Sequence, residues 1–307
     1  MVWSCLGSIL PGMAQTEKLT DYVNPFVGTD GYGNVYPGAQ IPFGGIQISP
    51  DTDSRFYDAA SGYKYNHLTL MGFSLTHLSG TGIPDLGDFL FIPGTGEMKL
   101  EPGTHEDPDQ GYRSRYSHDK EWASPTYYAV ELADYGVKAE MTSGVRRGMF
   151  RFTYPESDNA CSMIDMNHTL WQSCEWSNLR MINDSTITGY KLVKGWGPER
   201  HVYFTATFSK KLTGLRFVQD KKPVIYNTSR FRSSYEAWGK NLMACISFDT
   251  KAGEEVTVKT AISAVSTDGA RNNMKELDGL TFNELRAKGE ALWEKELGKY
   301  TLTADRK

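Results

Sequence analysis

The segment VELADYGVKAEMT, residues 130–142, decides the fold class. Apolar side chains alternate with polar ones on both sides of a central Asp134-Tyr135-Gly136 turn signal. A period of two places successive side chains on opposite faces of a strand, and Asp and Gly favour tight turns. The segment therefore predicts a β-hairpin with one face buried and the other facing water.

The same two-residue period recurs along the chain, at residues 150–154, 202–208, 242–248 and 256–262. Turn residues such as Gly, Pro, Asn and Asp separate these segments, and no internal repeat is present. Many strands at short spacing are typical of a sandwich or a barrel. We therefore predict an all-β fold built as a large antiparallel β-sandwich.

The pattern changes near Thr281. Thr281 and Glu284 have the spacing of a capping box, and apolar residues then recur at helical intervals until Gly298. This pattern predicts one helix over residues 282–297. An amphipathic helix with a Trp needs an apolar surface, so it either folds back on the sandwich or links it to a further domain.

Composition narrows the functional classes. The 307 residues carry a net charge of -4 without a dominant basic patch, which argues against nucleic acid as a partner. No stretch approaches the length needed to span a membrane. Aromatic residues make up 12% of the chain, a load that suits both a β core and a sugar-binding surface.

The cysteines do not suggest a metal site. Cys5 lies near the N-terminus, and Cys161, Cys174 and Cys245 form no Cys-x-x-Cys pair. An odd number of remaining cysteines argues against a full disulfide framework. We therefore predict that these three are buried free thiols.

The first 15 residues resemble the end of a secretion signal. A mostly apolar run precedes the cleavage-like stretch Pro11-Gly12-Met13-Ala14-Gln15, but no Lys or Arg precedes that run. We expect residues 1–15 to be a partial signal peptide whose true start lies upstream. The alternative is a short disordered N-terminus.

The polar, glycine-dense part of the chain lies between residues 24 and 88. Residues 28–38 contain four Gly, which allow a close approach to a ligand or a facing chain, but they fit neither a phosphate loop nor a dinucleotide motif. Residues 72–88 contain one His and two Asp, without the spacing of a zinc site, an EF-hand or a serine-hydrolase elbow. Each segment is equally compatible with a structural loop, and a lone histidine such as His77 is more often structural than catalytic.

Residues 51–65 place carboxylates beside aromatic rings, including Tyr57 and Asp58. A ring stacks on the apolar face of a sugar, and a carboxylate accepts hydrogen bonds from its hydroxyl groups. The residues alone leave two interpretations open, which are a sugar site and a polar loop with one buried aromatic side chain.

Taken in chain order, these segments resemble glycoside hydrolase family 92. The resemblance covers nearly all of the chain after the first 15 residues, and its most specific blocks are residues 72–74, 76–82 and 85–88. The other matching blocks are residues 22–30, 33–39, 42–44, 47–52, 61–63, 195–196, 201–204, 208–209, 263–272 and 293–298.

The resemblance implies an exported bacterial exo-acting α-mannosidase that trims mannose from glycans, inverts the anomeric centre and depends on calcium. In this family an N-terminal β-sandwich, of the supersandwich type, packs on an (α/α)6 barrel. We expect residues 16–270 to form the sandwich domain. Residues 271–307 would be a helical linker toward a catalytic domain that begins beyond Lys307. The expected location is the periplasm or the outside of a bacterial cell.

The resemblance also implies where the chemistry lies. Inversion needs one carboxylic acid and one carboxylate on opposite sides of the scissile bond. The family places both of them, and most calcium ligands, in the barrel. We therefore expect no catalytic residue and no metal ligand in this chain, no turnover by this chain alone, and mannose-containing glycans and the catalytic domain as its partners.

Loops of the sandwich reach the substrate cleft in this family. The residues that we predict to bind substrate are Tyr57, Asp58, Asp30, Asn34 and His77. Members specific for α-1,2 linkages have Trp and Cys where this chain has Tyr57 and Ala60, so the resemblance carries no linkage specificity here.

Two other functions remain compatible with the sequence. One is a free-standing carbohydrate-binding or interaction module without turnover. The other is an unrelated enzyme that is complete within this chain.

Overall fold

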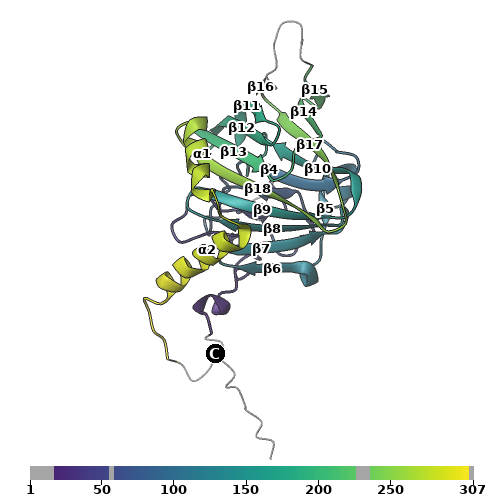
Figure 1. The fold of residues 1–307 in the computed structure, drawn as a ribbon. Helices are drawn as coiled ribbons and strands as arrows, with labels where there is room; N and C mark the ends of the chain where they lie inside the picture. The colour runs from purple at the N-terminus through teal and green to yellow at the C-terminus, as the bar shows by residue number, and fades with distance from the viewer. Residues whose placement is uncertain (1–16, 55–58, 226–235, 304–307) are drawn as a thin grey trace, which may run out of the picture.

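The protein is a sandwich of two antiparallel β-sheets with two α-helices beside it (Figure 1). A computed structural model describes residues 17–54, 59–225 and 236–303. In this part of the chain, one sheet has seven strands in the order β1 (Ser49–Asp51), β3 (Gly72–Ser74), β4 (Leu90–Thr95), β10 (Ser157–Asp165), β17 (Leu242–Thr250), β14 (Gly214–Gln219) and β15 (Lys222–Pro223).

The second sheet has nine described strands. Their order is β16 (Glu236–Gly239), β11 (Ser173–Asn183), β12 (Thr186–Lys194), β13 (Arg200–Phe208), β18 (Glu254–Ser263), β9 (Arg147–Tyr154), β8 (Val137–Ser143), β7 (Tyr127–Leu132) and β6 (Glu121–Ser124). A short pair lies apart from both sheets and consists of β2 (Thr69–Leu70) and β5 (Ser114–Arg115).

The predicted all-β sandwich is confirmed, and so are the strands expected from alternation. β7 and β8 form the predicted hairpin, with Leu132 opposite Val137 across the turn. The expected strands near residues 150, 204, 246 and 258 are β9, β13, β17 and β18.

Aromatic side chains fill the space between the two sheets. Phe91 of β4 lies 4.9 Å from Phe150 of β9, measured between ring centroids, and Phe89 lies 4.5 Å from Phe204 of β13. All four rings are fully buried. Burial of one such side chain contributes roughly 1.5–3 kcal/mol, so this layer is a major source of cohesion between the sheets.

The predicted helix is also confirmed. α2 spans Phe282–Leu297, and its capping box joins the Thr281 hydroxyl to the Glu284 amide and the Glu284 carboxylate to the Thr281 amide. The helix folds back on the sandwich, because Phe282 and Leu285 are buried against Met149 of β9. The Trp293 indole N–H donates to the Gln40 carbonyl at 2.9 Å.

The outer face of the hairpin is less exposed to solvent than the alternation predicts. Glu140 of β8 is only 4% exposed, because α2 covers the outer face of the sheet at this point. Its carboxylate accepts from Arg151 at 2.8 and 2.9 Å and from the Tyr127 hydroxyl at 2.6 Å. These contacts hold the pKa of Glu140 below its usual value, although burial alone would raise it.

A second helix, α1 (Thr267–Met274), was not expected from the sequence. Ser266 caps it by accepting from the Gly269 amide, and the helix packs on β18 and β13. The last described strand, β18, ends at Ser263, and α1 follows it. The described 3₁₀ turns are η1 (Leu19–Tyr22), η3 (Pro108–Gln110), η4 (His118–Lys120) and η5 (Lys275–Leu277).

Three cysteines have the predicted state. Cys161, Cys174 and Cys245 are free and buried, and burial raises the pKa of each thiol, to about 12 for Cys161. In the described part of the chain, none of the helices has the length and apolar character that crossing a membrane requires.

Gly289 lets α2 dock, and this contact is testable. A Cβ at this position would lie 2.7 Å from the Thr126 side chain. We expect Gly289→Ala to lower the free energy of unfolding by about 1 kcal/mol or more, despite the better helix propensity of Ala. Urea denaturation followed by circular dichroism measures this change. Ala287→Gly, on the exposed side of the helix, is the matched control for propensity alone, and a Gly289→Ala protein more stable than the original would contradict the docking.

Candidate functional site

A fully buried carboxylate lies beneath the glycine-dense loops. Asp51, at the end of β1, accepts a hydrogen bond from each of two histidines. The His77 Nε2 lies 2.8 Å from Oδ1, and the His168 Nε2 lies 2.8 Å from Oδ2. Burial alone would raise the pKa of Asp51, but the two imidazoles outweigh it and hold the pKa well below its usual value.

His77 has a partner on each ring nitrogen. Its Nδ1 lies 2.8 Å from the Gln47 carbonyl oxygen, which can only accept, so this nitrogen donates. Its Nε2 faces Asp51, and the residue is 2% exposed. The structure therefore places His77 below the loop surface as a positioning group.

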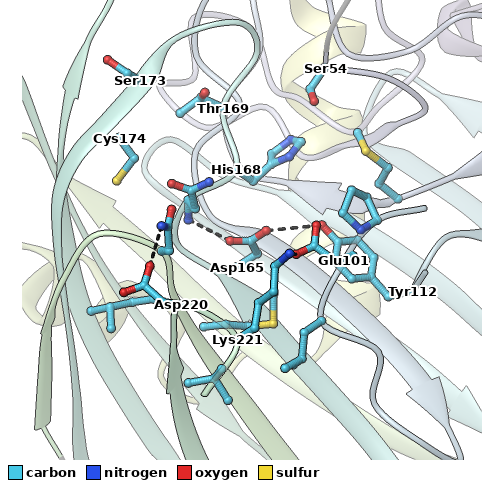
Figure 2. A pocket seen from close by; sticks show the side chains of 18 of the residues that line it. Ser54, Glu101, Tyr112, Asp165, His168, Thr169, Ser173, Cys174, Asp220 and Lys221 are labelled. Atoms are coloured by element: carbon cyan, nitrogen blue, oxygen red, sulfur yellow. Dashed lines mark hydrogen bonds and ion pairs between the residues drawn. The ribbon is translucent and has the colours of Figure 1, made fainter. Parts of the chain in front are cut away.

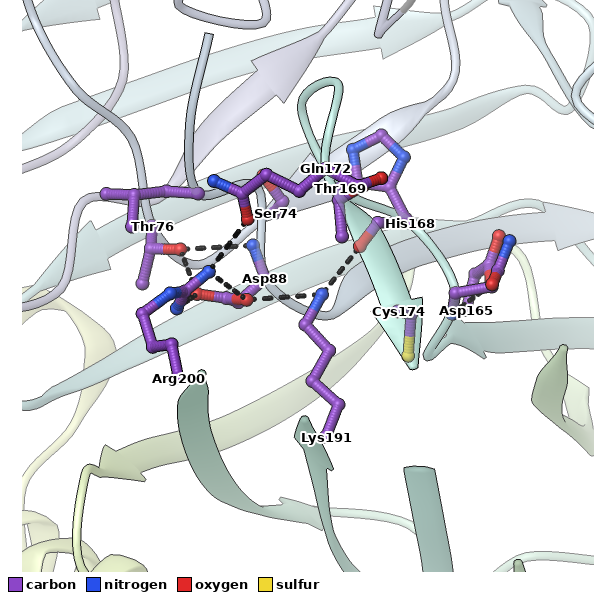
Figure 3. Close-up of polar contacts among 12 residues, drawn as sticks. Ser74, Thr76, Asp88, Asp165, His168, Thr169, Gln172, Cys174, Lys191 and Arg200 are labelled. Carbon is purple, nitrogen blue, oxygen red and sulfur yellow. Dashed lines mark hydrogen bonds and ion pairs between the residues drawn. The ribbon is translucent and has the colours of Figure 1, made fainter. Parts of the chain in front are cut away.

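A second buried carboxylate ties the two sheets together (Figure 3). Asp88 precedes β4, whereas Lys191 and Arg200 come from β12 and β13 of the opposite sheet. The Lys191 ammonium lies 3.2 Å from Asp88 Oδ1, and the Arg200 guanidinium lies 2.6 Å from Oδ2. Thr76 also donates to Oδ2, at 2.7 Å. Burial would raise the pKa of Asp88, but the two cations lower it well below its usual value.

The two carboxylate clusters are connected. The buried Lys191 ammonium also donates to the backbone carbonyl of His168 at 2.6 Å, while the ring of His168 binds Asp51. The position of Asp51 is therefore linked to the ion pair between the sheets. A network of this kind is rigid because every charged member has a partner.

This network explains one of the glycine motifs. Gly62 has a φ of +86°, and a Cβ added there would collide with the Asp51 carboxylate and press on His77. The loop before Tyr63 can follow its path only with glycine at position 62. The Ser61-Gly62-Tyr63 motif thus follows from the buried carboxylate beneath it.

Asn34 joins three of the predicted loops. Its backbone carbonyl accepts from the Gly80 amide at 2.7 Å and from the Ser61 hydroxyl. Its φ of +51° is unusual for a residue other than glycine, although Asn tolerates this region better than most. Its Oδ1 is buried and has no hydrogen-bond partner among the described residues.

The predicted site residues therefore differ in their exposure to solvent. Asp30 is exposed in the same loop as Asn34, with its carboxylate accepting from the Gly31 amide at 2.8 Å. His77 lies below, on Asp51. Tyr57 and Asp58 lie outside the described residues.

Sequence reasoning missed Asp51, His168, Lys191 and Arg200 as parts of the framework. The sequence does carry a signal for one of these residues, Lys191. Lys191 shares its strand phase with the inward residues Ile187 and Val193, so alternation alone would have placed a charge in the core. No local pattern identifies its partner Asp88, which is about a hundred positions away.

No group of three or more His, Cys, Asp or Glu side chains in the described ranges is arranged to hold a metal ion.

The lowered pKa of Asp88 makes a prediction about acid stability. A carboxyl group whose folded pKa is depressed stabilises the protein above its unfolded pKa, and this contribution is lost as the pH falls through the folded pKa. Asp88→Asn should cost about 3–5 kcal/mol at pH 7, because Lys191 keeps a buried charge without its counterion. The difference from the original protein should shrink below about pH 4.

Urea denaturation at several pH values measures this difference. Asp158→Asn, which removes an exposed carboxylate, serves as the control and should run parallel to the original protein. A stability difference for Asp88→Asn that stays constant from pH 7 to about pH 3 would contradict the assignment.

Comparison with known proteins places the chain in a family. The profile of the glycosyl hydrolase family 92 N-terminal domain matches residues 22–263. A family 92 α-mannosidase from Bacteroides thetaiotaomicron is 99% identical, with a TM-score of 0.93, and the match covers 96% of this chain and 40% of that one. Its complex with mannoimidazole gives a TM-score of 0.92 over 94% of this chain and 38% of that one, again at 99% identity.

Another relative is less similar in sequence. An uncharacterized secreted glycosidase of Arthroderma benhamiae is 26% identical over 92% of this chain and 38% of its own length. The chain thus spans about two fifths of the proteins that it matches. Since the profile match covers all described strands of the sandwich, the chain belongs to glycosyl hydrolase family 92 and contains its N-terminal domain.

Proposed function

We propose that this chain is the N-terminal part of an exo-acting α-mannosidase that removes mannose from glycans. The observation that carries this proposal is the 99% identity to an α-mannosidase of Bacteroides thetaiotaomicron, which also has a solved complex with mannoimidazole. The finer properties rest on the family resemblance. They are inversion of the anomeric centre, calcium dependence and a location in the periplasm or outside the cell.

The two carboxylates of the buried network, Asp51 and Asp88, are unsuited to general acid catalysis. An inverting glycosidase needs a carboxylic acid with a raised pKa to protonate the leaving oxygen. Asp51 and Asp88 have lowered pKa values and are shielded from solvent. This supports the proposal that the acid, the base and the calcium ligands belong to the part of the enzyme beyond this chain.

The sandwich would contribute recognition. Asp30 is exposed and Asn34 fixes three loops, so we propose that this loop set faces the substrate cleft. Tyr57 would stack on a sugar beyond the scissile bond, and Asp58 would accept from a mannose hydroxyl. His77 would act indirectly, by holding Asp51 under Gly62.

A first prediction concerns activity. The 307-residue chain should release no mannose from aryl α-mannosides or α-mannobiose, with or without calcium, because we assign the paired carboxyl groups to the rest of the enzyme. The longer enzyme, assayed in parallel, should release mannose from the same substrates. Calcium-dependent release by the 307-residue chain would contradict the assignment of catalysis to the rest of the enzyme. Inactivity of the longer enzyme on every α-mannoside would contradict the proposed α-mannosidase function.

A second prediction concerns Tyr57. In the longer enzyme, Tyr57→Ala should lower kcat/KM on a mannose disaccharide by about tenfold, the effect of a contact worth about 1.4 kcal/mol in the transition state. An aryl mannoside should respond much less, because its leaving group makes different contacts. Trp176→Ala, which removes an exposed aromatic side chain on β11, is the control. A ratio between the two substrates that does not change, with a lower melting temperature, would assign Tyr57 to packing.

A further inference from the structure

A third buried carboxylate, outside the network of Asp51 and Asp88, gathers hydroxyl groups around it. Glu121 opens β6, and its side chain is 1% exposed. Its carboxylate accepts from the Tyr63 hydroxyl at 2.9 Å and from the Tyr128 hydroxyl. Burial, above all, raises the pKa of both tyrosines well above the usual value, so their hydroxyl groups keep the protons that they donate. Glu121 therefore accepts in both contacts, as an ionised carboxylate does.

His118, in η4, has an acceptor at each ring nitrogen. Its Nδ1 lies 2.6 Å from Glu121 Oε2, and its Nε2 lies 2.8 Å from the backbone carbonyl oxygen of Tyr65. A carbonyl oxygen and an ionised carboxylate can only accept. Both contacts are therefore hydrogen bonds only when both ring nitrogens carry a proton. The geometry fits the charged imidazolium form of His118.

The ring of Tyr65 favours the same charged form. It lies parallel to the His118 imidazole, with ring centroids 4.0 Å apart and an angle of 4° between the planes. A cation over the face of an aromatic ring is attracted by the ring quadrupole. Tyr116 also faces His118, with its ring at 89° to the imidazole and a centroid distance of 5.5 Å.

His118 is open to solvent on one side. Its side chain is 25% exposed, unlike that of Glu121. On the same turn, Asp119 is exposed and Lys120 binds Glu131 at 2.6 Å. Histidine is the side chain whose charge ordinarily changes between about pH 5 and 8. The protonation of His118 can therefore follow the pH of the surroundings.

Loss of one proton would break the contact with Tyr65 and keep the contact with Glu121. A neutral imidazole has a single N–H. A hydrogen bond to an ionised carboxylate is stronger than one to a backbone carbonyl, so the remaining proton stays on Nδ1. The lone pair of Nε2 then faces the Tyr65 carbonyl oxygen, and two acceptors repel each other.

Tyr65 connects this contact to the loop that carries Asp30. The Tyr65 amide donates to the Thr29 carbonyl at 3.0 Å, and the neighbouring Lys64 ammonium donates to the Gly31 carbonyl. The backbone is thus tied on both sides of Asp30 by two adjacent residues. Asp30 itself is exposed, so its position depends on how firmly this backbone is held.

We propose that His118 is a positioning residue, which holds the Asp30 loop in place for substrate while its imidazole is protonated. The role in substrate binding rests on the proposed function, in which Asp30 faces the substrate cleft. The coupling of His118 to Tyr65 and Thr29 rests on the contacts themselves. The longer enzyme therefore binds substrate more tightly on the acidic side of the His118 titration.

The first test is hydrogen exchange of the 307-residue chain, followed by NMR on both sides of the His118 titration, which the imidazole C–H resonances report. The protection factor of the Tyr65 amide, corrected for the intrinsic effect of pH on exchange, should fall by about tenfold or more as His118 loses its proton. In His118→Gln, which is neutral at every pH, this protection should be low throughout. His201→Gln is the matched control, because His201 also has a carboxylate partner, Glu199, but lies on β13.

The second test measures hydrolysis of α-mannobiose by the longer enzyme. On the acidic side of the His118 titration, His118→Gln should raise KM by about threefold or more and leave kcat within about twofold. On the basic side, the variant and the original enzyme should have the same KM. Comparing the two enzymes at each pH cancels the titration of groups that both share. His201→Gln should match the original enzyme at every pH.

The outcomes separate the coupling, the positioning role and the proposed function. A Tyr65 amide in the original chain whose protection is independent of the His118 proton would overturn the coupling, and this measurement needs no variant. Protection that follows His118, combined with a KM ratio that is the same at all pH values, would overturn the role in substrate binding. Inactivity of the longer enzyme on every α-mannoside would contradict the proposed function instead, while the exchange measurement still decides the coupling.

Discussion

The ion pair between Asp88 and Lys191 is the contact on which the rest of the structure depends. Lys191 is a fully buried cation inside an aromatic core, so it is tolerated only while the carboxylate from the opposite sheet remains beside it. Such a pair adds little net stability compared with apolar residues, but its disruption leaves an uncompensated charge. It therefore fixes β12 against the segment before β4. Through the carbonyl of His168, the same ammonium also fixes the residue that holds Asp51.

The regular elements could be predicted because their signals are local. Alternation located the hairpin of β7 and β8, and the capping box located α2 to the residue. The pairing of strands could not be predicted. β10 lies between β4 and β17, which come from distant parts of the chain, and their registers are set by packing in the core rather than by any neighbouring residue. The short α1 was missed because its eight residues bury only Ala270 and show no apolar stripe.

The candidate site, too, could be predicted only in part. Glycine-dense motifs indicated loops that approach one another, and Asn34 does bring Ser61 and Gly80 together. The sequence did not show which of these residues would be buried and which exposed. His77 belongs to a motif that suggests chemistry, yet each of its ring nitrogens already has a hydrogen-bond partner and the residue is buried, whereas Asp30 is exposed. Exposure depends on what the whole sandwich places around a residue, and no motif encodes it.

Asp51 stands between two histidines that come from distant parts of the chain. One of its oxygens holds His77 under the loops around Gly62, and the other holds His168, which lines the pocket drawn in Figure 2. Because both histidines share a single buried carboxylate, neither histidine can shift freely relative to the other. A carboxylate kept ionised and enclosed cannot take part in proton transfer, but it is well suited to fixing geometry. Under the proposed function, the sandwich thus supplies preorganised recognition, and proton transfer falls to carboxyl groups elsewhere in the enzyme.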